Sequence, residues 1–479
     1  MAAADNHYDV IAVGTGPATM AFLHRYLGTA PATARVLLLE KGANRPYAWY
    51  VKNRNATFHR CFDHYENRTP QKQWVFNVGV GGGSICWVGQ TPRMVPNDFR
   101  MKRVYGVGED WPITYEQLET YYLQAENLMQ ISGDSERSPV PRSGPFPQPP
   151  HRMAAAERAL FEAHPQTFFH MPTARTRTAS AGRNVCCASG VCWYCPVEAK
   201  FTVLNGLGHV LEDPRVRLVA EAAVTEILHS ADTASGVRYT RNGTAHTARG
   251  DLVLLGANGI FNPFILQRSG IVQKALGRYL HEQCSCTVRV ELKGLENVGG
   301  STWSGGCSYL FYDGPHRRER AGALVLTESG SLRNFRMEPG RWQQRLDFGV
   351  CFEDLPQFDN YVAPSASDPT RPQTYFGKRS AYFQRGYKSL AANVEALIAP
   401  LPVERWELLN PPSRTEAHIQ GTTRMGTDPE TSVIDANLVH HRLRNVVVLG
   451  SGAFPTGAPA NPTLTITALS LRCADKLTS

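Results

Sequence analysis

Four cysteines fall within ten residues in the middle of the chain: Cys186, Cys187, Cys192 and Cys195. Thiolates at this density are typical of metal or redox chemistry, because a disulfide framework belongs to short chains with evenly spaced cysteines. Zinc favours paired Cys-x2-Cys units, and only Cys192 and Cys195 have that spacing. A disulfide between the neighbours Cys186 and Cys187 would be strained. A metal-bound loop and a metal-free loop therefore stay open.

A glycine turn near the N-terminus is the second candidate site. The apolar run 8–13 predicts a buried strand, and Gly14-Thr-Gly16-Pro-Ala-Thr19 follows it directly. A helix over 20–27 would then aim its free N–H groups at an anion. A second apolar run ends in Glu40, about 20 residues beyond the turn, where a carboxylate suits a ribose hydroxyl. These features predict a dinucleotide site, and an ordinary strand–turn–helix is the alternative.

The turn departs from the usual pattern at its third position, where Thr19 stands in place of Gly or Ala. The predicted cofactor contacts in this segment are Gly14, Gly16, Thr19 and Glu40.

Two later segments repeat the order of buried strand and glycine turn. Residues 251–255 lead to Gly256-Ala257, and residues 445–449 lead to Gly450-Ser-Gly452-Ala453. We expect Ala257, Gly452 and Ala453 to contact the cofactor. Because the three units are spread along the chain, the cofactor domain must be discontinuous, which is typical of flavoproteins rather than soluble NAD dehydrogenases.

The elements that must position these residues predict an α/β protein of two domains. An FAD-binding, Rossmann-like domain is expected from residues 1–95, 196–286 and 413–479. A substrate-binding α+β domain with an antiparallel sheet is expected from 96–195 and 287–412, and it includes the cysteine loop.

Several segments resemble the glucose–methanol–choline oxidoreductase family. The resemblance is carried by four C-terminal runs, at residues 418–428, 432–435, 454–456 and 461–465. Two further islands narrow the branch: residues 80–93 are similar to pyranose oxidases, and residues 110–122 to bacterial sugar and gluconate dehydrogenases. The resemblance implies FAD-dependent oxidation of a sugar or glycoside hydroxyl to a ketone or lactone, with hydride transfer to flavin N5.

The resemblance also assigns roles to particular residues. His418 aligns with the catalytic histidine, and Asn461 with its partner. Because an amide cannot take a proton, His418 is the expected base, as histidine suits this role. A structural histidine and a turn-starting Asn461 are the alternatives. Intact His418 and Asn461 argue against a lyase of the family or a non-catalytic electron-transfer subunit. The further expected cofactor contacts are Gly82, Gly83, Ser84, Cys86, Pro462 and Thr463, together with Asn461 itself.

Cys86 takes the position at which pyranose oxidases carry a histidine joined covalently to the flavin. A cysteinyl link is chemically feasible because thiolates are good nucleophiles. The favoured interpretation is a small buried residue beside noncovalently bound FAD.

The Cys-Cys-x4-Cys spacing resembles the segment that binds a 3Fe–4S cluster in catalytic subunits of bacterial FAD-dependent glucose dehydrogenases. It implies Cys186, Cys187 and Cys192 as ligands, with Cys195 as a further candidate. Electrons would then leave through the iron–sulfur cluster to a cytochrome or quinone, in an enzyme with a small partner subunit. Without a cluster, an oxidase that makes hydrogen peroxide is the alternative.

Composition excludes other classes of protein. Against 42 Asp and Glu there are 50 Lys and Arg, a formal net charge of +8 that indicates a solvated surface rather than nucleic-acid binding. The chain has no run of about 18 apolar residues, so no membrane-spanning helix is expected. The N-terminal residues show no signal-peptide pattern, which favours the cytoplasm. The alternative, implied by the resemblance, is the periplasm by co-export with a partner subunit.

Overall fold

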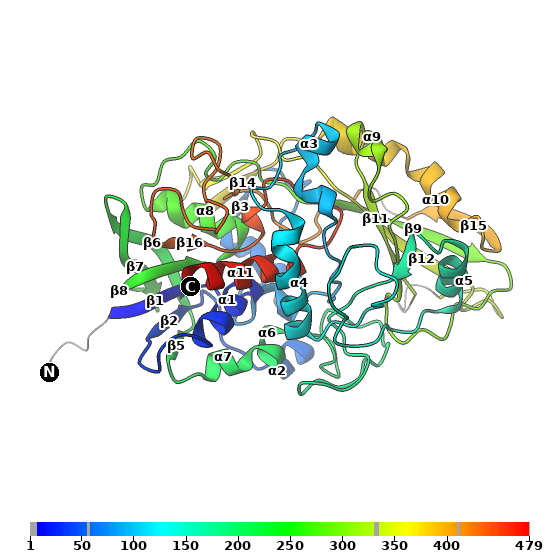
Figure 1. Cartoon of the computed structure of the whole chain (residues 1–479), viewed down its shortest axis with the longest axis horizontal. Coiled ribbons are helices and arrows are strands. Elements are labelled where there is room, and N and C mark those ends of the chain that lie inside the picture. The colour runs from blue at the N-terminus through cyan, green and yellow to red at the C-terminus, as the bar shows by residue number, and fades with distance from the viewer. Residues whose placement is uncertain (1–6, 55–57, 330–334, 410–411, 479) are drawn as a thin grey trace.

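The computed structural model describes residues 7–54, 58–329, 335–409 and 412–478. Two large sheets lie at opposite ends of the molecule's long axis, and both chain ends emerge beside the first sheet (Figure 1). The predicted mixed α/β class, with a parallel-stranded cofactor sheet and an antiparallel second sheet, is confirmed.

The first sheet has three buried, mostly aliphatic strands at its centre. β1 pairs in parallel with β2 and with β8, and β16 also pairs in parallel with β8. The order is β5-β2-β1-β8-β7-β6, in which β6 and β7 are antiparallel. Its strands are β1 (His7–Val13), β2 (Val36–Leu39), β5 (Val216–Val219), β6 (Ala222–Ser230), β7 (Thr233–Arg241), β8 (Thr244–Leu255) and β16 (Val446–Val448).

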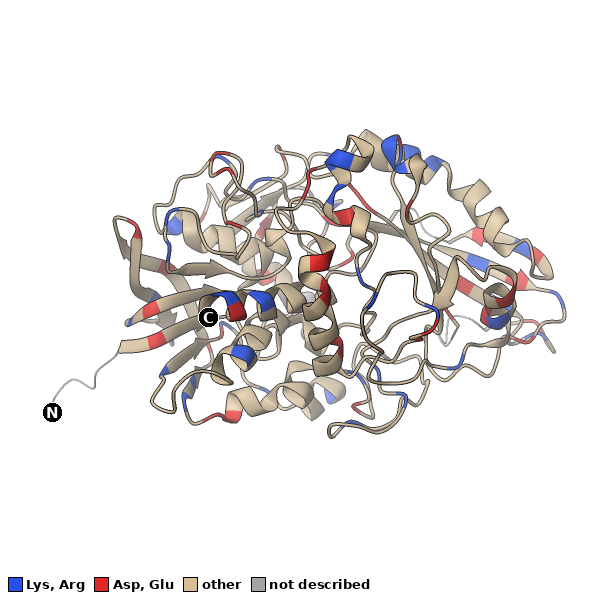
Figure 2. Cartoon of the chain, viewed as in Figure 1, with Lys and Arg blue, Asp and Glu red and all other residues tan. Residues whose placement is uncertain are grey.

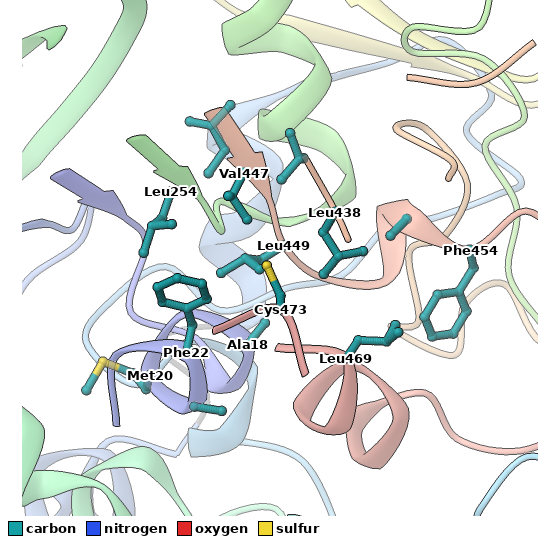
Figure 3. Packing of buried hydrophobic residues seen from close by; sticks show 14 of the residues in the cluster. Ala18, Met20, Phe22, Leu254, Leu438, Val447, Leu449, Phe454, Leu469 and Cys473 are labelled. Atoms are coloured by element: carbon teal, nitrogen blue, oxygen red, sulfur yellow. The ribbon is translucent and has the colours of Figure 1, made fainter. Parts of the chain in front are cut away.

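Helices α1 (Pro17–Leu27) and α11 (Thr463–Thr478) pack against each other beside this sheet, and α4 (Tyr115–Met129) packs on α11. Figure 3 shows side chains of this layer, including Phe22 of α1, Leu254 of β8 and Cys473 of α11. All three are buried. Burial of an aromatic or aliphatic side chain of this size contributes about 1.5–3 kcal/mol. This layer therefore fixes the start of α1, and with it the glycine turn, relative to α11.

The second sheet is antiparallel, in the order β15-β9-β12-β11-β10-β4. Alternate residues at the start of β9 face the core, which is why Cys284 and Cys286 are both buried. Its strands are β4 (Phe168–His170), β9 (Cys284–Leu292), β10 (Gly306–Ser308), β11 (Ala323–Glu328), β12 (Arg345–Phe352) and β15 (Val403–Leu408).

Smaller elements connect and cover the two sheets. The smaller helices and strands are α2 (Tyr47–Lys52), η1 (Phe58–His64), β3 (Glu66–Asn67), η2 (Gly82–Ile85), η3 (Pro96–Phe99), α3 (Met101–Tyr105), α5 (Ala155–Ala163), α6 (Val203–Gly206), α7 (Gly208–Glu212), α8 (Asn258–Arg268), η4 (Pro315–Arg318), β13 (Tyr361–Pro364), β14 (Pro372–Tyr375), α9 (Ala381–Lys388), α10 (Leu390–Ile398) and η6 (Ser451–Ala453). Three of these strands form a third sheet, in the order β13-β14-β3.

The strands of the first sheet all fall within the ranges predicted for the FAD domain. β9 starts at Cys284, a few residues before the predicted boundary at 286, because its ladder with β12 already begins there. The division of the chain into two domains otherwise stays a prediction.

Charged residues of both signs are interspersed over the chain rather than gathered by sign (Figure 2). Such mixing suits a solvated surface. Within the described residues, no helix has both the length and the apolar character needed to cross a membrane.

Candidate active site

A cavity of about 610 Å³ reaches from the first sheet to the second. At one end it is lined by the last residues of β1 and β2, Val13 and Leu39, and by the glycine turn that follows β1. At the other end lie Ser285 of β9, Leu326 of β11 and Cys351 of β12. A ligand in this cavity would therefore contact both sheets.

Gly14 brings the turn close to a neighbouring strand. Its φ of +86° disfavours any side chain, and a Cβ there would lie 2.5 Å from the carbonyl oxygen of Gly256. The turn starts α1, whose N-cap residue Gly16 lines the cavity and has no side chain to bond the first helical N–H groups. The free N–H groups of α1 and its dipole thus face the cavity and suit a diphosphate.

Glu40 holds the turn in place. Its Oε2 accepts hydrogen bonds from Thr15 N at 3.1 Å and Thr15 Oγ1 at 2.7 Å, and its Oε1 accepts one from Gly42 N at 2.8 Å. Burial raises the pKa of Glu40, while these hydrogen bonds oppose the shift. Thr15 Oγ1 in turn accepts a hydrogen bond from Gly81 N at 3.1 Å. This bond connects the turn to the second glycine run, which is residues 81–83. Glu40 lines the cavity, and a carboxylate has room for a further donor such as a ribose hydroxyl.

Most of the predicted site residues line this one cavity. They are Gly14, Gly16, Glu40, Gly82, Gly83, Ser84, Cys86, Ala257, His418, Asn461, Pro462 and Thr463.

Three predicted cofactor contacts lie behind the cavity wall instead. Thr19 is buried where α1 meets Gly256, and Ala453 belongs to the hydrophobic core. A Cβ on Gly452 would lie 2.7 Å from Thr423 Oγ1, so that glycine faces protein rather than ligand. The third glycine unit does reach the cavity, but through Leu449, Gly450 and Ser451. The predicted contacts Gly452 and Ala453 directly follow these lining residues in the chain.

His418 lines the same cavity. Its backbone N–H donates to Glu282 Oε2 at 3.0 Å, and its ring Nδ1 lies 3.2 Å from Gln283 Oε1. The Nε2 atom has no hydrogen-bond partner among the described residues. Burial lowers the pKa of His418 to about 4, and the Glu282 carboxylate opposes the shift only in part. The ring is therefore neutral near pH 7 and able to accept a proton.

Three buried polar atoms of residues that line the cavity have no partner within the described chain: Asn77 Oδ1, Asn461 Oδ1 and Trp303 Nε1. The two amide oxygens are acceptors, and the indole nitrogen is a donor. Because an unpaired buried polar group costs about 1–3 kcal/mol, each is best explained by a ligand that completes its hydrogen bond. FAD, with a hydroxylated substrate beside it, fits this arrangement of the glycine turn after β1, the N-terminus of α1 and the unpaired atoms.

Cys86 lines the cavity, with its Sγ 3.7 Å from the carbonyl oxygen of Gly83. Burial raises the pKa of this thiol to about 11, and the nearby Lys200 lowers it only in part. The side chain is therefore a thiol rather than a thiolate near pH 7. This supports the interpretation of Cys86 as a small buried residue beside noncovalent FAD.

The four clustered cysteines do not form a metal site in this structure. Cys187 is exposed, Cys192 and Cys195 are buried, and Cys186 Sγ lies 3.6 Å from Thr302 Oγ1. Among the described residues, no three His, Cys, Asp or Glu side chains come together to hold a metal ion. The iron–sulfur ligand set is therefore not supported by the arrangement of these side chains.

The cysteine segment nevertheless borders the cavity. Trp193 lines it, and the buried Lys200 ammonium donates to the carbonyl oxygens of Trp193 at 2.8 Å, Trp87 at 2.7 Å and Ile85 at 3.0 Å. Lys200 thus joins the cysteine segment to the chain that follows the second glycine run.

Three polar residues at the site were not predicted from the sequence: Glu282, Gln283 and Glu416. Glu282 and Gln283 directly precede β9, and Glu416 lines the cavity two residues before His418. The sequence offered one signal for them, which was that Glu282 and Gln283 stand at the start of a buried strand. Their position does not show which distant loop their side chains contact.

A model of the GMC oxidoreductase family matches residues 377–470, which contain His418 and Asn461. The fructose dehydrogenase large subunit of Gluconobacter japonicus is 26% identical over 466 residues, spanning 86% of this chain and 82% of that protein. The C-glycoside 3-oxidase of Arthrobacter globiformis is 30% identical over 283 residues, 56% of this chain and 54% of the relative.

Solved structures share the fold along the whole chain. Pyridoxine 4-oxidase from Mesorbium loti superposes with a TM-score of 0.68 at 16% identity, covering 98% of this chain and 99% of that one. An FAD-dependent oxidoreductase from Chaetomium thermophilum gives a TM-score of 0.69 at 13% identity, again over 98% and 99%. The family match, the curated relatives and this fold agree with the cavity that suits FAD. Residues 377–470 therefore match the GMC oxidoreductase family, and most of the chain is similar to sugar and alcohol oxidoreductases and shares the fold of FAD-dependent enzymes.

Proposed function

We propose that this enzyme oxidises a hydroxyl group of a sugar or glycoside to a ketone or lactone. The observation that carries the proposal is that His418 and Asn461 line the same cavity as the glycine turn after β1 and residues of the second sheet. The oxidoreductase class follows from the family, and the substrate class and the acceptor are the proposal.

FAD, when bound, supplies the hydride acceptor at its N5 atom. The chain supplies the base: His418 Nε2 accepts the hydroxyl proton as the carbon-bound hydrogen leaves with its electron pair. A neutral ring is required for this, and the pKa of His418, lowered by burial to about 4, keeps the ring in that form near pH 7. The Asn461 side-chain amide can donate a hydrogen bond to the reacting oxygen, which carries increasing negative charge.

The lining of the pocket favours a ligand with several hydroxyl groups. Gln90, Ser285 and Glu416 offer both donors and acceptors, and Trp303 adds an aromatic face with an unpaired buried N–H. Two of the relatives are named for a sugar and a glycoside, fructose and C-glycosides. A sugar or glycoside satisfies this lining better than a simple alcohol with one hydroxyl.

The acceptor of the electrons separates two versions of this proposal. The dehydrogenase version passes them through an iron–sulfur cluster at Cys186, Cys187, Cys192 and Cys195 to a cytochrome or quinone, with a small partner subunit. It is supported by the similarity to a protein named as a large subunit and by the position of Trp193 at the cavity. The oxidase version uses oxygen and is supported by the C-glycoside 3-oxidases and by the absence of a three-donor metal group among the described residues.

A stepwise spectroscopic experiment tests the proposal. Purified protein is titrated without air with monosaccharides and with O- and C-glycosides, and the flavin absorbance is followed. We expect bleaching by at least one of these compounds and none by ethanol or propanediol. Readmitted oxygen should then restore the colour with formation of hydrogen peroxide in the oxidase version. In the dehydrogenase version, only a quinone or dye should restore it quickly. Flavin that bleaches with simple alcohols alone would overturn the sugar assignment.

A further inference from the structure

The side chain of Gln283 connects the candidate base to the loop that carries its partner. Its Nε2 lies 2.8 Å from the carbonyl oxygen of Ala458 and 2.6 Å from that of Ala460, immediately before Asn461. Its Oε1 lies 3.2 Å from His418 Nδ1 and accepts a hydrogen bond from Gln420 Nε2 at 3.1 Å. The side chain is buried, with 2% of its surface exposed.

These contacts determine which end of the Gln283 amide carries the hydrogens and which ring nitrogen of His418 carries the proton. Backbone carbonyl oxygens only accept hydrogen bonds, so the end of Gln283 that meets Ala458 and Ala460 must be the NH₂ group. The end that meets His418 is then the amide oxygen, which also only accepts. His418 Nδ1 must therefore carry the ring proton, and the lone pair of the neutral ring is on Nε2.

We infer that Gln283 is the positioning residue that holds His418 in the Nδ1–H tautomer and couples it to the Asn461 loop. This inference rests on the proposed function only in that His418 is the base of the reaction. It assigns a role to a residue that itself has no place in the lining of the cavity.

Glu282 fixes the backbone of the same segment and so completes the arrangement. Its carboxylate oxygens accept from the N–H groups of Glu416 at 3.1 Å and His418 at 3.0 Å, and it forms a buried ion pair with Lys72. With the backbone held by Glu282, the remaining freedom of His418 is rotation of its ring. The Gln283 amide oxygen restricts that rotation, because it accepts a hydrogen bond only when the protonated Nδ1 of the ring points toward it.

The test replaces Gln283 with methionine, which has a similar length but neither amide group. The direct readout is the ¹⁵N NMR spectrum of histidine-labelled holoenzyme, in which the signals of His418 are identified by their loss in His418→Gln. We expect wild type to show a protonated Nδ1 and an unprotonated Nε2 near pH 7. In Gln283→Met the two tautomers should exchange, and the two nitrogen signals should move toward each other.

The kinetic readout is the limiting rate of flavin reduction by substrate without air. It should fall by about 10- to 1,000-fold in Gln283→Met, because much of the base is then in the wrong tautomer or orientation. FAD content should stay at the wild-type level. Gln420→Met is the matched control, since it removes the other hydrogen bond to the same oxygen and leaves His418 in contact with Gln283. Its tautomer signals should match those of wild type.

Gln283→Glu provides a rescue in its protonated form, because the carbonyl oxygen of the carboxyl group accepts from Nδ1–H while its O–H donates to the carbonyl oxygen of Ala458 or Ala460. We expect the Nδ1–H signal to persist in this variant and the reduction rate to exceed that of Gln283→Met. An Nε2–H tautomer in wild type, or unchanged histidine signals in Gln283→Met, would overturn the inference. The NMR measurement needs no substrate, so it stands even if no sugar reduces the flavin, in which case the proposed function alone fails.

Discussion

Thr19 Oγ1 occupies the space that a side chain at residue 256 would need: a Cβ on Gly256 would lie 1.8 Å from that oxygen. Dinucleotide-binding turns usually place a small residue at the position of Thr19, so that the helix can approach the sheet closely. In this chain the small residue lies on the opposite side of the contact, at the end of β8. The close packing of α1 on the sheet is kept although the usual pattern is not.

This contact predicts an asymmetric pair of variants. Gly256→Ala should lower the free energy of unfolding by about 1–3 kcal/mol, because the added methyl group overlaps Thr19. Thr19→Ala should be neutral or slightly stabilising, since its buried Oγ1 has no hydrogen-bond partner among the described residues. In the double variant, the cost of Gly256→Ala should decrease. Urea unfolding of the four proteins gives the coupling energy, and strictly additive effects would contradict the overlap.

Gly14→Val should abolish retention of FAD. Valine is strained at a φ of +86°, and its Cβ would lie 2.5 Å from the Gly256 carbonyl oxygen, so the turn cannot keep its shape. Flavin content after gel filtration measures the effect. Gly106→Ala is the control, because its φ is +75° but no atom lies within 4 Å of the added Cβ. It should keep its flavin, and equal loss in both variants would mean that backbone strain alone is responsible.

The sequence was sufficient to predict the parts of the site that are local in the chain. The apolar run before Gly14, the helix after it and Glu40 lie within about 35 residues, and their spacing has a direct physical meaning. The structure confirms their strand–turn–helix arrangement and places all of them at the cavity except Thr19.

Contacts between distant segments could not be predicted in the same way. Gln283 meets His418 and Ala460 across more than a hundred residues of chain, and Thr19 meets Gly256 across more than two hundred. No local pattern reports which side chain completes such a contact. In the cysteine segment, nearness in sequence is likewise a poor guide to position: Cys187 is exposed, whereas Cys192 is buried.

His418→Ala should keep FAD bound and lower the rate of flavin reduction by about 10²- to 10⁴-fold, the range expected for a lost general base. FAD retention is expected because the cofactor cradle is made by the turn and Glu40. Stopped-flow reduction without air measures the rate. A normal limiting rate with only a weaker apparent affinity for substrate would remove His418 from the role of base.

The free energy of unfolding should decrease on acidification, because buried histidines are neutral in the folded protein and take up a proton on unfolding. Burial lowers the pKa of His151 from 6.5 to about 4. Below pH 6.5 the unfolded chain therefore takes up a proton that the folded protein excludes until about pH 4. This difference should cost about 2 kcal/mol between pH 7 and pH 5 for a single histidine. His151→Gln should show a smaller decrease over that interval in urea unfolding, and an equal decrease would show that other groups cause it.

Cys187→Ser separates the two versions of the electron exit. Cys187 is exposed and does not line the cavity, so we expect flavin reduction by substrate to be unchanged in this variant. If the cysteine segment binds iron in the cell, protein prepared without air should contain iron, and Cys187→Ser should lose both that iron and turnover with a large acceptor. Iron analysis with electron paramagnetic resonance of the oxidised protein measures this, since an oxidised 3Fe–4S cluster is paramagnetic and zinc is silent. If the wild-type protein contains no iron and is fully active with oxygen, the iron–sulfur cluster is excluded and the oxidase version remains. The reduced flavin would then need no electron relay through the cysteine segment.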